Sequence, residues 1–182
     1  MVNTSIFLTQ QNVVFLASTK ALLMHQTHHT LAEKIRSRST QTLNRHLAAA
    51  IDLHAQLKQA HWNVRGASFI AMHELFDRVS VEVENVSDLL AERIGGLGGV
   101  AEGRLKVVVS SSYLTPYLEG LGEETIHVFA VSAALASFSG EVRGSIEDTA
   151  KSGDAVTSDL FTQVCRSIDQ QLWFVESHQD PR

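Results

Sequence analysis

Apolar residues recur at the α-helical period in four long stretches of this chain, and this pattern restricts the fold more than any other feature of the sequence. The stretches run over about 40–63, 68–94, 123–146 and 155–177, with turn-forming residues between them. Only two prolines occur among the 182 residues, so few positions forbid a helix. The segment over 95–122 begins with four glycines in five residues and shows no long periodic pattern. Four long helices with one long middle connection predict an all-α four-helix bundle.

Residues at the ends of these stretches agree with the expected helix limits. Ser68 is a suitable N-cap for the second helix, and Glu123 and Glu124 suit the positive N-terminal end of the third. In the middle connection, Thr115-Pro116 predicts a brief helical turn, whereas the three valines at 107–109 are too few for a strand. The single cysteine, Cys165, lies in an apolar-periodic stretch, which favours a buried core thiol over a nucleophile.

The length of the chain predicts one domain. We expect a polar N-terminal tail over 1–38, a bundle domain over 39–178 and a short C-terminal tail over 179–182. An apolar run over 13–24 is shorter than the roughly 20 residues of a membrane-spanning helix, and no basic stretch precedes it as in a secretory signal. We therefore expect a cytoplasmic protein without membrane contact. Met24 is an alternative translational start, which would remove 1–23 from the natural protein.

Basic residues and histidines near the N-terminus leave two interpretations open. The net charge of −5 argues against a surface that binds nucleic acid as a whole. Only a local cluster could do so, and Lys34, Arg36 and Arg38 are either such a DNA contact or an ordinary solvated segment. A second group of three residues is either a metal site or, more often in a polar tail, a set of solvated side chains: His25, His28 and His29.

Two pairs of metal-ligand residues lie on the second expected helix. His73 and Asp77 are four residues apart, as are Asp88 and Glu92, so each pair shares one helix face. Such pairs also occur by chance on solvated faces. His61, near the end of the preceding helix, strengthens the case, because nitrogen and carboxylate ligands together suit ferrous iron.

Iron sites inside helical bundles usually follow another pattern, the ferritin-like di-iron motif Glu-x-x-His on two helices. Here only Glu124-Thr125-Ile126-His127 matches, and its position at a helix start favours a capping role. The ligands must therefore be gathered differently, and a site shared across a symmetric subunit interface is an attractive solution.

The motifs together resemble the Dps family of mini-ferritins. The resemblance covers about 43–177 and is carried by Lys58-Gln59-Ala60-His61-Trp62-Asn63-Val64-Arg65-Gly66, His73-Glu74-Leu75-Phe76-Asp77, Asp88-Leu89-Leu90-Ala91-Glu92-Arg93, Gly95-Gly96-Leu97-Gly98-Gly99 and Leu172-Trp173-Phe174-Val175-Glu176-Ser177. It implies a ferritin-like four-helix bundle with a short helix in the middle connection, and a hollow shell of twelve subunits. It also implies a di-iron site in which His61, His73 and Asp77 of one subunit meet Asp88 and Glu92 of its two-fold neighbour.

The resemblance further implies a reaction. Fe(II) is oxidised between subunits, preferentially by hydrogen peroxide, and ferric iron is stored inside the shell, which protects DNA and other targets. Trp62 matches the aromatic residue that donates an electron during oxidation, although it equally fits a core or interface aromatic. Asp154 and Asp159 are candidates for acid-lined pores, and equally for helix caps.

Three questions stay open at this level. His54 lies seven residues before His61, roughly 10 Å along the axis, so it is either an accessory metal ligand or a hydrogen-bonded interface histidine. The tail is poor in lysine compared with family members that coat DNA, which argues against DNA binding. A member that binds DNA and associates with the nucleoid stays the alternative function. A third possibility is a member that holds zinc in the same pocket and oxidises iron slowly.

Overall fold

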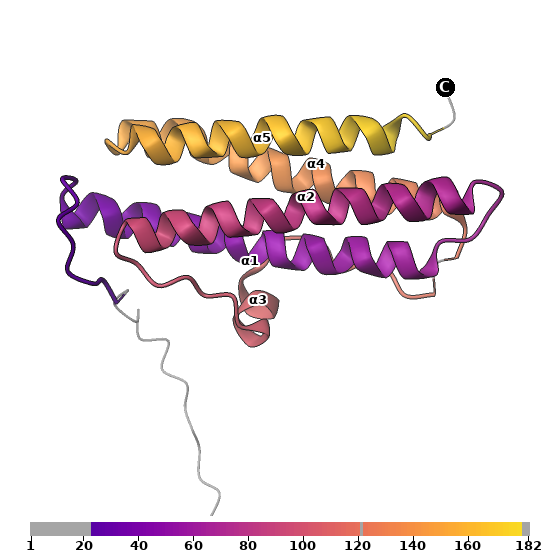
Figure 1. The fold of residues 1–182 in the computed structure, drawn as a ribbon, viewed down its shortest axis with the longest axis horizontal. Helices are drawn as coiled ribbons and strands as arrows, with labels where there is room; N and C mark the ends of the chain where they lie inside the picture. The colour runs from indigo at the N-terminus through magenta and orange to yellow at the C-terminus, as the bar shows by residue number, and fades with distance from the viewer. Residues whose placement is uncertain (1–22, 121, 180–182) are drawn as a thin grey trace, which may run out of the picture.

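The computed structural model describes residues 23–120 and 122–179, and within them it contains five helices and no strand (Figure 1). The four long helices are α1 (Glu33–Asn63), α2 (Phe69–Gly96), α4 (Glu124–Lys151) and α5 (Ala155–Glu176), and the short helix α3 (Leu105–Ser111) lies in the connection between α2 and α4. The predicted all-α bundle with a short helix in its middle connection is therefore confirmed.

The four long helices surround one apolar core. α1 packs against α2 and α4 against α5, and contacts between α1 and α4 and between α2 and α5 join the two pairs. Phe76, Phe138 and Phe161 are the largest side chains that are fully buried between them. Cys165 is buried beside this core, as the sequence predicts. The helix α3 contacts α1 and projects from the bundle (Figure 1).

By length and composition alone, α4 is apolar enough to cross a membrane, and it is the one such helix among the described residues. Its packing explains that composition differently. Val131, Leu135 and Phe138 are buried against the neighbouring helices, as expected for a helix in a protein core.

The first helix begins earlier than the sequence indicates. The predicted start was Thr40, but α1 begins at Glu33, so the expected boundary at residue 38 falls inside the helix. Arg36 lies in the roughly two added turns and fixes them: the residue is only 7% exposed, and its side chain donates hydrogen bonds to the carbonyl oxygens of Leu31 and Leu97. A buried residue with a charged side chain is invisible to an analysis of apolar periodicity. Because Arg36 is buried, its interpretation as part of a solvated basic cluster is wrong.

The short helix lies elsewhere than predicted. The turn expected at Thr115-Pro116 is not helical, whereas the segment with three valines is. Val108 is buried, but Leu105 and Val109 are exposed, so this helix lacks the apolar stripe that would reveal it. The other helix limits lie close to those expected.

The segment before α1 contacts the end of α2 near Gly98. The backbone N–H of His25 donates to the carbonyl oxygen of Gly98 at 2.7 Å. Gly98 has a φ of +80°, and a Cβ there would lie 2.9 Å from the oxygen of His25, so both its conformation and this contact favour glycine. Residues 1–22, with the apolar run over 13–24 except its end, lie outside the described residues.

Candidate metal centre

His61 of α1 and His73 of α2 form a stacked pair near the α1–α2 turn. Their ring centroids are 3.7 Å apart and their planes differ by 20°. Nδ1 of His61 bonds to the carbonyl oxygen of His73 at 2.8 Å, and Nδ1 of His73 bonds to the carbonyl oxygen of His61 at 2.7 Å. Because a carbonyl oxygen only accepts, both Nδ1 atoms carry hydrogen. In the neutral rings, each Nε2 therefore keeps a lone pair that is available to a metal ion.

Asp77 lies one helical turn after His73 and is already paired with a cation. Its Oδ1 accepts a hydrogen bond from Nζ of Lys58 on α1 at 2.5 Å. This hydrogen bond is the main cause that holds the pKa of Asp77 below its ordinary 3.8, and the charge of Lys58 acts in the same direction. The carboxylate is therefore ionised near neutral pH and lies close to both rings. An incoming metal ion would have to share Asp77 with Lys58 or displace it.

The start of α4 holds the α1–α2 turn in place. The backbone of Arg65 donates to the carbonyl oxygen of Gly122 at 2.8 Å, and its own carbonyl oxygen accepts from Glu124 at 3.1 Å. The side chain of Glu124 also accepts from the backbone N–H of Ser68 at 2.9 Å. Ser68 is the N-cap of α2 but makes no side-chain cap itself. The carboxylate of Glu124 therefore supplies the cap to another helix, a long-range role that the capping prediction for α4 missed.

Gly66 makes room for this arrangement. A Cβ at Gly66 would lie 2.3 Å from Oε2 of Glu124, closer than two such atoms can approach. The glycine in the turn thus allows Glu124 to reach Ser68 and fix the end of the hairpin that carries the two histidines.

The second pair of candidate ligands lies on another part of α2. Asp88 is 11 residues after Asp77, roughly 16 Å along the helix axis, so Asp88 and Glu92 cannot bind the same ion as His73 within one subunit. Both are exposed. Within the described part of the chain, no group of three or more histidine, cysteine or acidic side chains is placed to hold a metal ion. One subunit therefore brings His61 and His73 into contact, places Asp77 one turn further along α2, and leaves the carboxylates of Asp88 and Glu92 apart.

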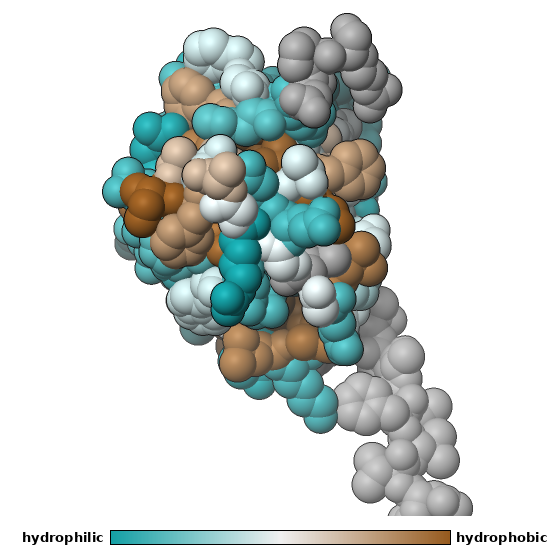
Figure 2. All heavy atoms as spheres, turned by 90° about the vertical axis from the view of Figure 1, so that its right-hand side faces the viewer, coloured by the Kyte–Doolittle hydropathy of each residue, from teal (hydrophilic) through white to brown (hydrophobic). Residues whose placement is uncertain are grey.

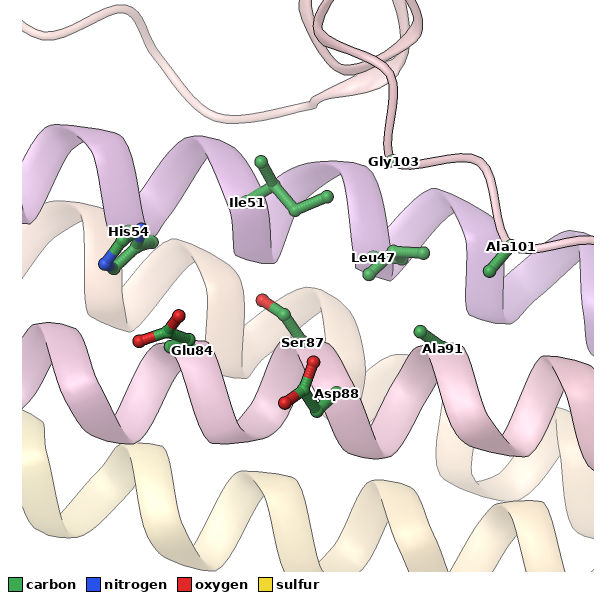
Figure 3. Close-up of a pocket in the computed structure, with 9 residues that line it drawn as sticks. All are labelled: Leu47, Ile51, His54, Glu84, Ser87, Asp88, Ala91, Ala101 and Gly103. Carbon is green, nitrogen blue, oxygen red and sulfur yellow. The ribbon is translucent and has the colours of Figure 1, made fainter.

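Asp88 lines a surface groove of about 310 Å³ between α1, α2 and the connection that follows α2 (Figure 3). His54 of α1 and Glu84 of α2 face each other across one end of the groove, and Leu47 and Ile51 form an apolar wall. The groove thus combines carboxylates with apolar surface. His54 shares this groove with Asp88, faces Glu84, and lies about two turns before His61 on α1.

Apolar side chains are exposed at the end of the bundle that carries the histidine pair. Trp62 is 68% exposed directly after His61, and Phe69, Ile70 and Trp173 near the same end are also exposed. Figure 2 looks at this end and shows apolar side chains, in brown, between polar ones. Trp62 is therefore not a core residue of the single subunit.

The structure separates the two pore candidates. Asp154 is buried at the start of α5, where it accepts hydrogen bonds from the backbone and hydroxyl of Thr157 and from Arg93 at 2.8 Å. Its carboxylate is the N-cap of α5 and faces no solvent. Asp159, one turn later, is exposed.

The three tail histidines form no metal cluster. His25 and His28 are exposed, and Nδ1 of His29 accepts from the backbone N–H of Leu31 at 3.1 Å. Because this bond uses the lone pair of His29 Nδ1, the ring acts in the local turn before α1.

Comparison with known proteins agrees with the fold and the motifs. The ferritin-like domain family matches residues 40–181. The chain is 38% identical over 154 residues to the DNA protection during starvation protein of Agrobacterium fabrum, covering 85% of this chain and 95% of the relative. Among solved structures, it is similar to DpsA14 from Streptomyces coelicolor, with a TM-score of 0.81, 33% identity and coverage of 87% of this chain and 94% of the other. DpsC from the same organism gives a TM-score of 0.82 with 31% identity over the same shares of both chains.

Proposed function

Because this chain belongs to the Dps family of ferritin-like proteins, we propose that it is a ferroxidase that oxidises Fe(II), preferentially with hydrogen peroxide, and stores the ferric product inside a shell of its own subunits. Family membership supports an iron-related function in general. The finer assignment rests on the residues of the candidate metal centre.

The stacked pair of His61 and His73 is the observation that carries the proposal. Two Nε2 atoms with their lone pairs held available, beside an ionised Asp77, are half of a site for ferrous iron. The other half has to come from carboxylates, and those of Asp88 and Glu92 are too far along α2 in the same subunit. In a two-fold dimer each subunit offers the same surface to the other. The histidines of each subunit can therefore meet the carboxylates of its partner, which gives two equivalent sites per dimer.

Iron is the substrate in this reaction. Two Fe(II) ions each lose one electron, and one peroxide molecule with two protons becomes two water molecules. Paired electron removal avoids the one-electron step that releases hydroxyl radical. Trp62, which is exposed and adjacent to His61, would supply an electron when only one iron is bound. The two-fold partner would cover the exposed apolar side chains around it.

Lys58 sets a condition for binding. Its ammonium group occupies Oδ1 of Asp77 before iron arrives, so the ion that uses Asp77 must displace a positive charge.

We propose that the shell is a dodecamer with two-fold sites of this kind, located in the cytoplasm. Asp159 is the pore candidate, because Asp154 is engaged within the subunit.

The test compares the protein with an Asp88→Ala, Glu92→Ala variant. Both are loaded with Fe(II) without oxygen, peroxide is added, and ferric absorbance is followed beside a hydroxyl-radical trap. The proposal expects rapid ferric formation with little trapped radical in the natural protein and slow oxidation in the variant. Size-exclusion chromatography shows whether the variant still assembles. Equal oxidation rates in two assembled proteins would remove Asp88 and Glu92 from the site.

DNA binding is a second candidate function, favoured by the relatives named for DNA protection during starvation. Lys34 and Arg38 are exposed and remain available for phosphate contacts, whereas Arg36 is buried. Retardation of DNA that weakens with added salt and with Lys34→Ala would support DNA binding.

Metal analysis of protein purified without added iron would show whether zinc occupies the candidate metal centre instead of iron.

A further inference from the structure

Both tyrosines of the chain are hydrogen-bonded to a buried histidine. The hydroxyl of Tyr113 lies 3.0 Å from Nδ1 of His46, and the hydroxyl of Tyr117 lies 2.6 Å from Nδ1 of His127. His46 and His127 are each fully buried. A phenol that loses an electron must also lose its proton, and a ring nitrogen at this distance can accept it. The two pairs are therefore candidates for one-electron oxidation, and their surroundings differ.

The pair of Tyr113 and His46 opposes an added positive charge. The hydroxyl of Ser145 donates to the carbonyl oxygen of Glu141 and accepts from Nε2 of His46 at 2.8 Å, so Nδ1 is the nitrogen that accepts from Tyr113. Burial first, and then the charge of Arg45, lower the pKa of His46 to about 4. The guanidinium of Arg45 also lies 4.7 Å from the centre of the Tyr113 ring. A proton moved to His46 would be held against this charge.

The pair of Tyr117 and His127 has access to the surface. Tyr117 lines a groove of about 230 Å³ between the middle connection and α4, whose walls include Phe129 and Pro116. The groove is large enough to admit small oxidants, and Tyr113 does not line it. Burial raises the pKa of Tyr117, so the phenol keeps its proton until it is oxidised.

This second pair also lies at the level of the histidine pair in the bundle. The backbones of Arg65 and Glu123 pair where α1 ends and α4 begins. His61 is four residues before Arg65, and His127 is four residues after Glu123, so both lie about one turn from that pairing. Gln56, which lines the groove with Tyr117, is also on α1 within about one and a half turns of His61.

We propose that Tyr117, with His127 as its proton acceptor, is a redox site that reduces hydroxyl radical escaping from iron oxidation. Tyr117 gives one electron to the radical, which becomes hydroxide, and the phenol proton moves to Nδ1 of His127. When that proton passes on to hydroxide, the net change converts one phenol and one hydroxyl radical into one tyrosyl radical and one water molecule. This role rests on the proposed ferroxidase function, because iron oxidation is the source of the hydroxyl radical. The ability of Tyr117 to donate an electron does not depend on that function.

The first experiment omits iron. Azide radical, a one-electron oxidant made by pulse radiolysis, is reacted with the assembled protein and with Tyr117→Phe and Tyr113→Phe variants, and the tyrosyl radical is followed by its absorbance and by electron paramagnetic resonance. We expect the radical in the natural protein and in Tyr113→Phe, and its loss in Tyr117→Phe. Formation should be slower in deuterated water, since a proton moves with the electron. A tyrosyl signal that survives in Tyr117→Phe, or is absent from the natural protein, would overturn the proposal.

The second experiment adds Fe(II) and peroxide and counts trapped hydroxyl radical. Tyr117→Phe should release several times more radical than Tyr113→Phe while both oxidise iron at the natural rate. Equal release from the two variants would overturn the role of Tyr117, even where iron oxidation is fast. Slow iron oxidation in all three proteins would instead contradict the ferroxidase function, and the result with azide radical would still decide whether Tyr117 donates.

Discussion

Replacement of Asp154 by alanine should destabilise the protein strongly without changing its iron chemistry. Asp154 has a side chain that is 0% exposed and accepts from the backbone N–H of Thr157 at 3.0 Å, from its hydroxyl at 2.6 Å and from Arg93 at 2.8 Å. Loss of an N-cap costs about 1 kcal/mol. Loss of the partner of a buried charge costs about 3–5 kcal/mol when that charge is left fully buried.

The size of the effect follows from what remains around Arg93. Its side chain is 17% exposed and keeps a hydrogen bond from Nε to the hydroxyl oxygen of Thr157. We therefore expect about 2 kcal/mol from the broken pair and about 3 kcal/mol in total. For a domain of this size, that corresponds to a melting temperature lower by about 6–12 °C. Thermal unfolding of Asp154→Ala beside Asp159→Ala measures it, because Asp159 is exposed on the same helix and its loss should change the melting temperature little.

Acid should remove the difference between the natural protein and the Asp154 variant. Burial alone would raise the pKa of Asp154, but the hydrogen bonds from Thr157 and the charge of Arg93 outweigh it, and the pKa lies below 3.8. A carboxyl group whose pKa is lower in the folded state stabilises that state above its unfolded pKa, and the stabilisation is lost as pH falls through the folded pKa. The two melting curves should therefore begin to converge below about pH 4 and should merge only below the pKa of Asp154 in the folded protein. An Asp154→Ala protein that melts like the natural protein but takes up iron slowly would refute the capping role and support a pore.

Four further substitutions, made in three experiments, test the candidate metal centre and the nearby groove. Lys58→Met should raise the affinity of the site for a divalent ion, measured by calorimetry with Zn²⁺ or Co²⁺, because Asp77 loses its competing cation. An unchanged affinity would mean that the ion pair between Lys58 and Asp77 does not limit metal binding. Gly66→Ala should weaken metal binding and lower the melting temperature through its clash with Glu124, and Glu124→Ala in the same chain should remove the clash but not restore the cap of α2. His54→Ala should leave the initial rate of iron oxidation nearly unchanged, and a large loss would make His54 a ligand.

Apolar periodicity predicted the four long helices, but it predicted neither the first turns of α1 nor the position of α3. Residues such as Leu90 and Leu135 repeat at the helical period and are fully buried, so α2 and α4 were readable from the sequence. Arg36 is buried through hydrogen bonds to backbone oxygens, and α3 buries only Val108, so neither the start of α1 nor α3 shows such a repeat.

The residue types of the candidate site were also readable, but their contacts depend on how the helices pair. Lys58 and Asp77 meet because of the register of the α1–α2 hairpin, and Glu124 reaches Ser68 across 56 residues of sequence. The stacking of His61 on His73 with both Nδ1 atoms on backbone oxygens is likewise a consequence of that register. Spacing along a single helix carries no information about such contacts.

Mixed shells test most directly whether the site is shared between subunits. Subunits with His73→Ala and subunits with Asp88→Ala, Glu92→Ala are each expected to oxidise iron slowly, and they are then dissociated and reassembled together. A mixed dimer contains one doubly altered site and one intact site, so random mixing should restore about a quarter of the natural rate. Recovery near that level would show that histidines of one subunit work with carboxylates of its partner. No recovery in correctly assembled mixed shells would contradict the shared site.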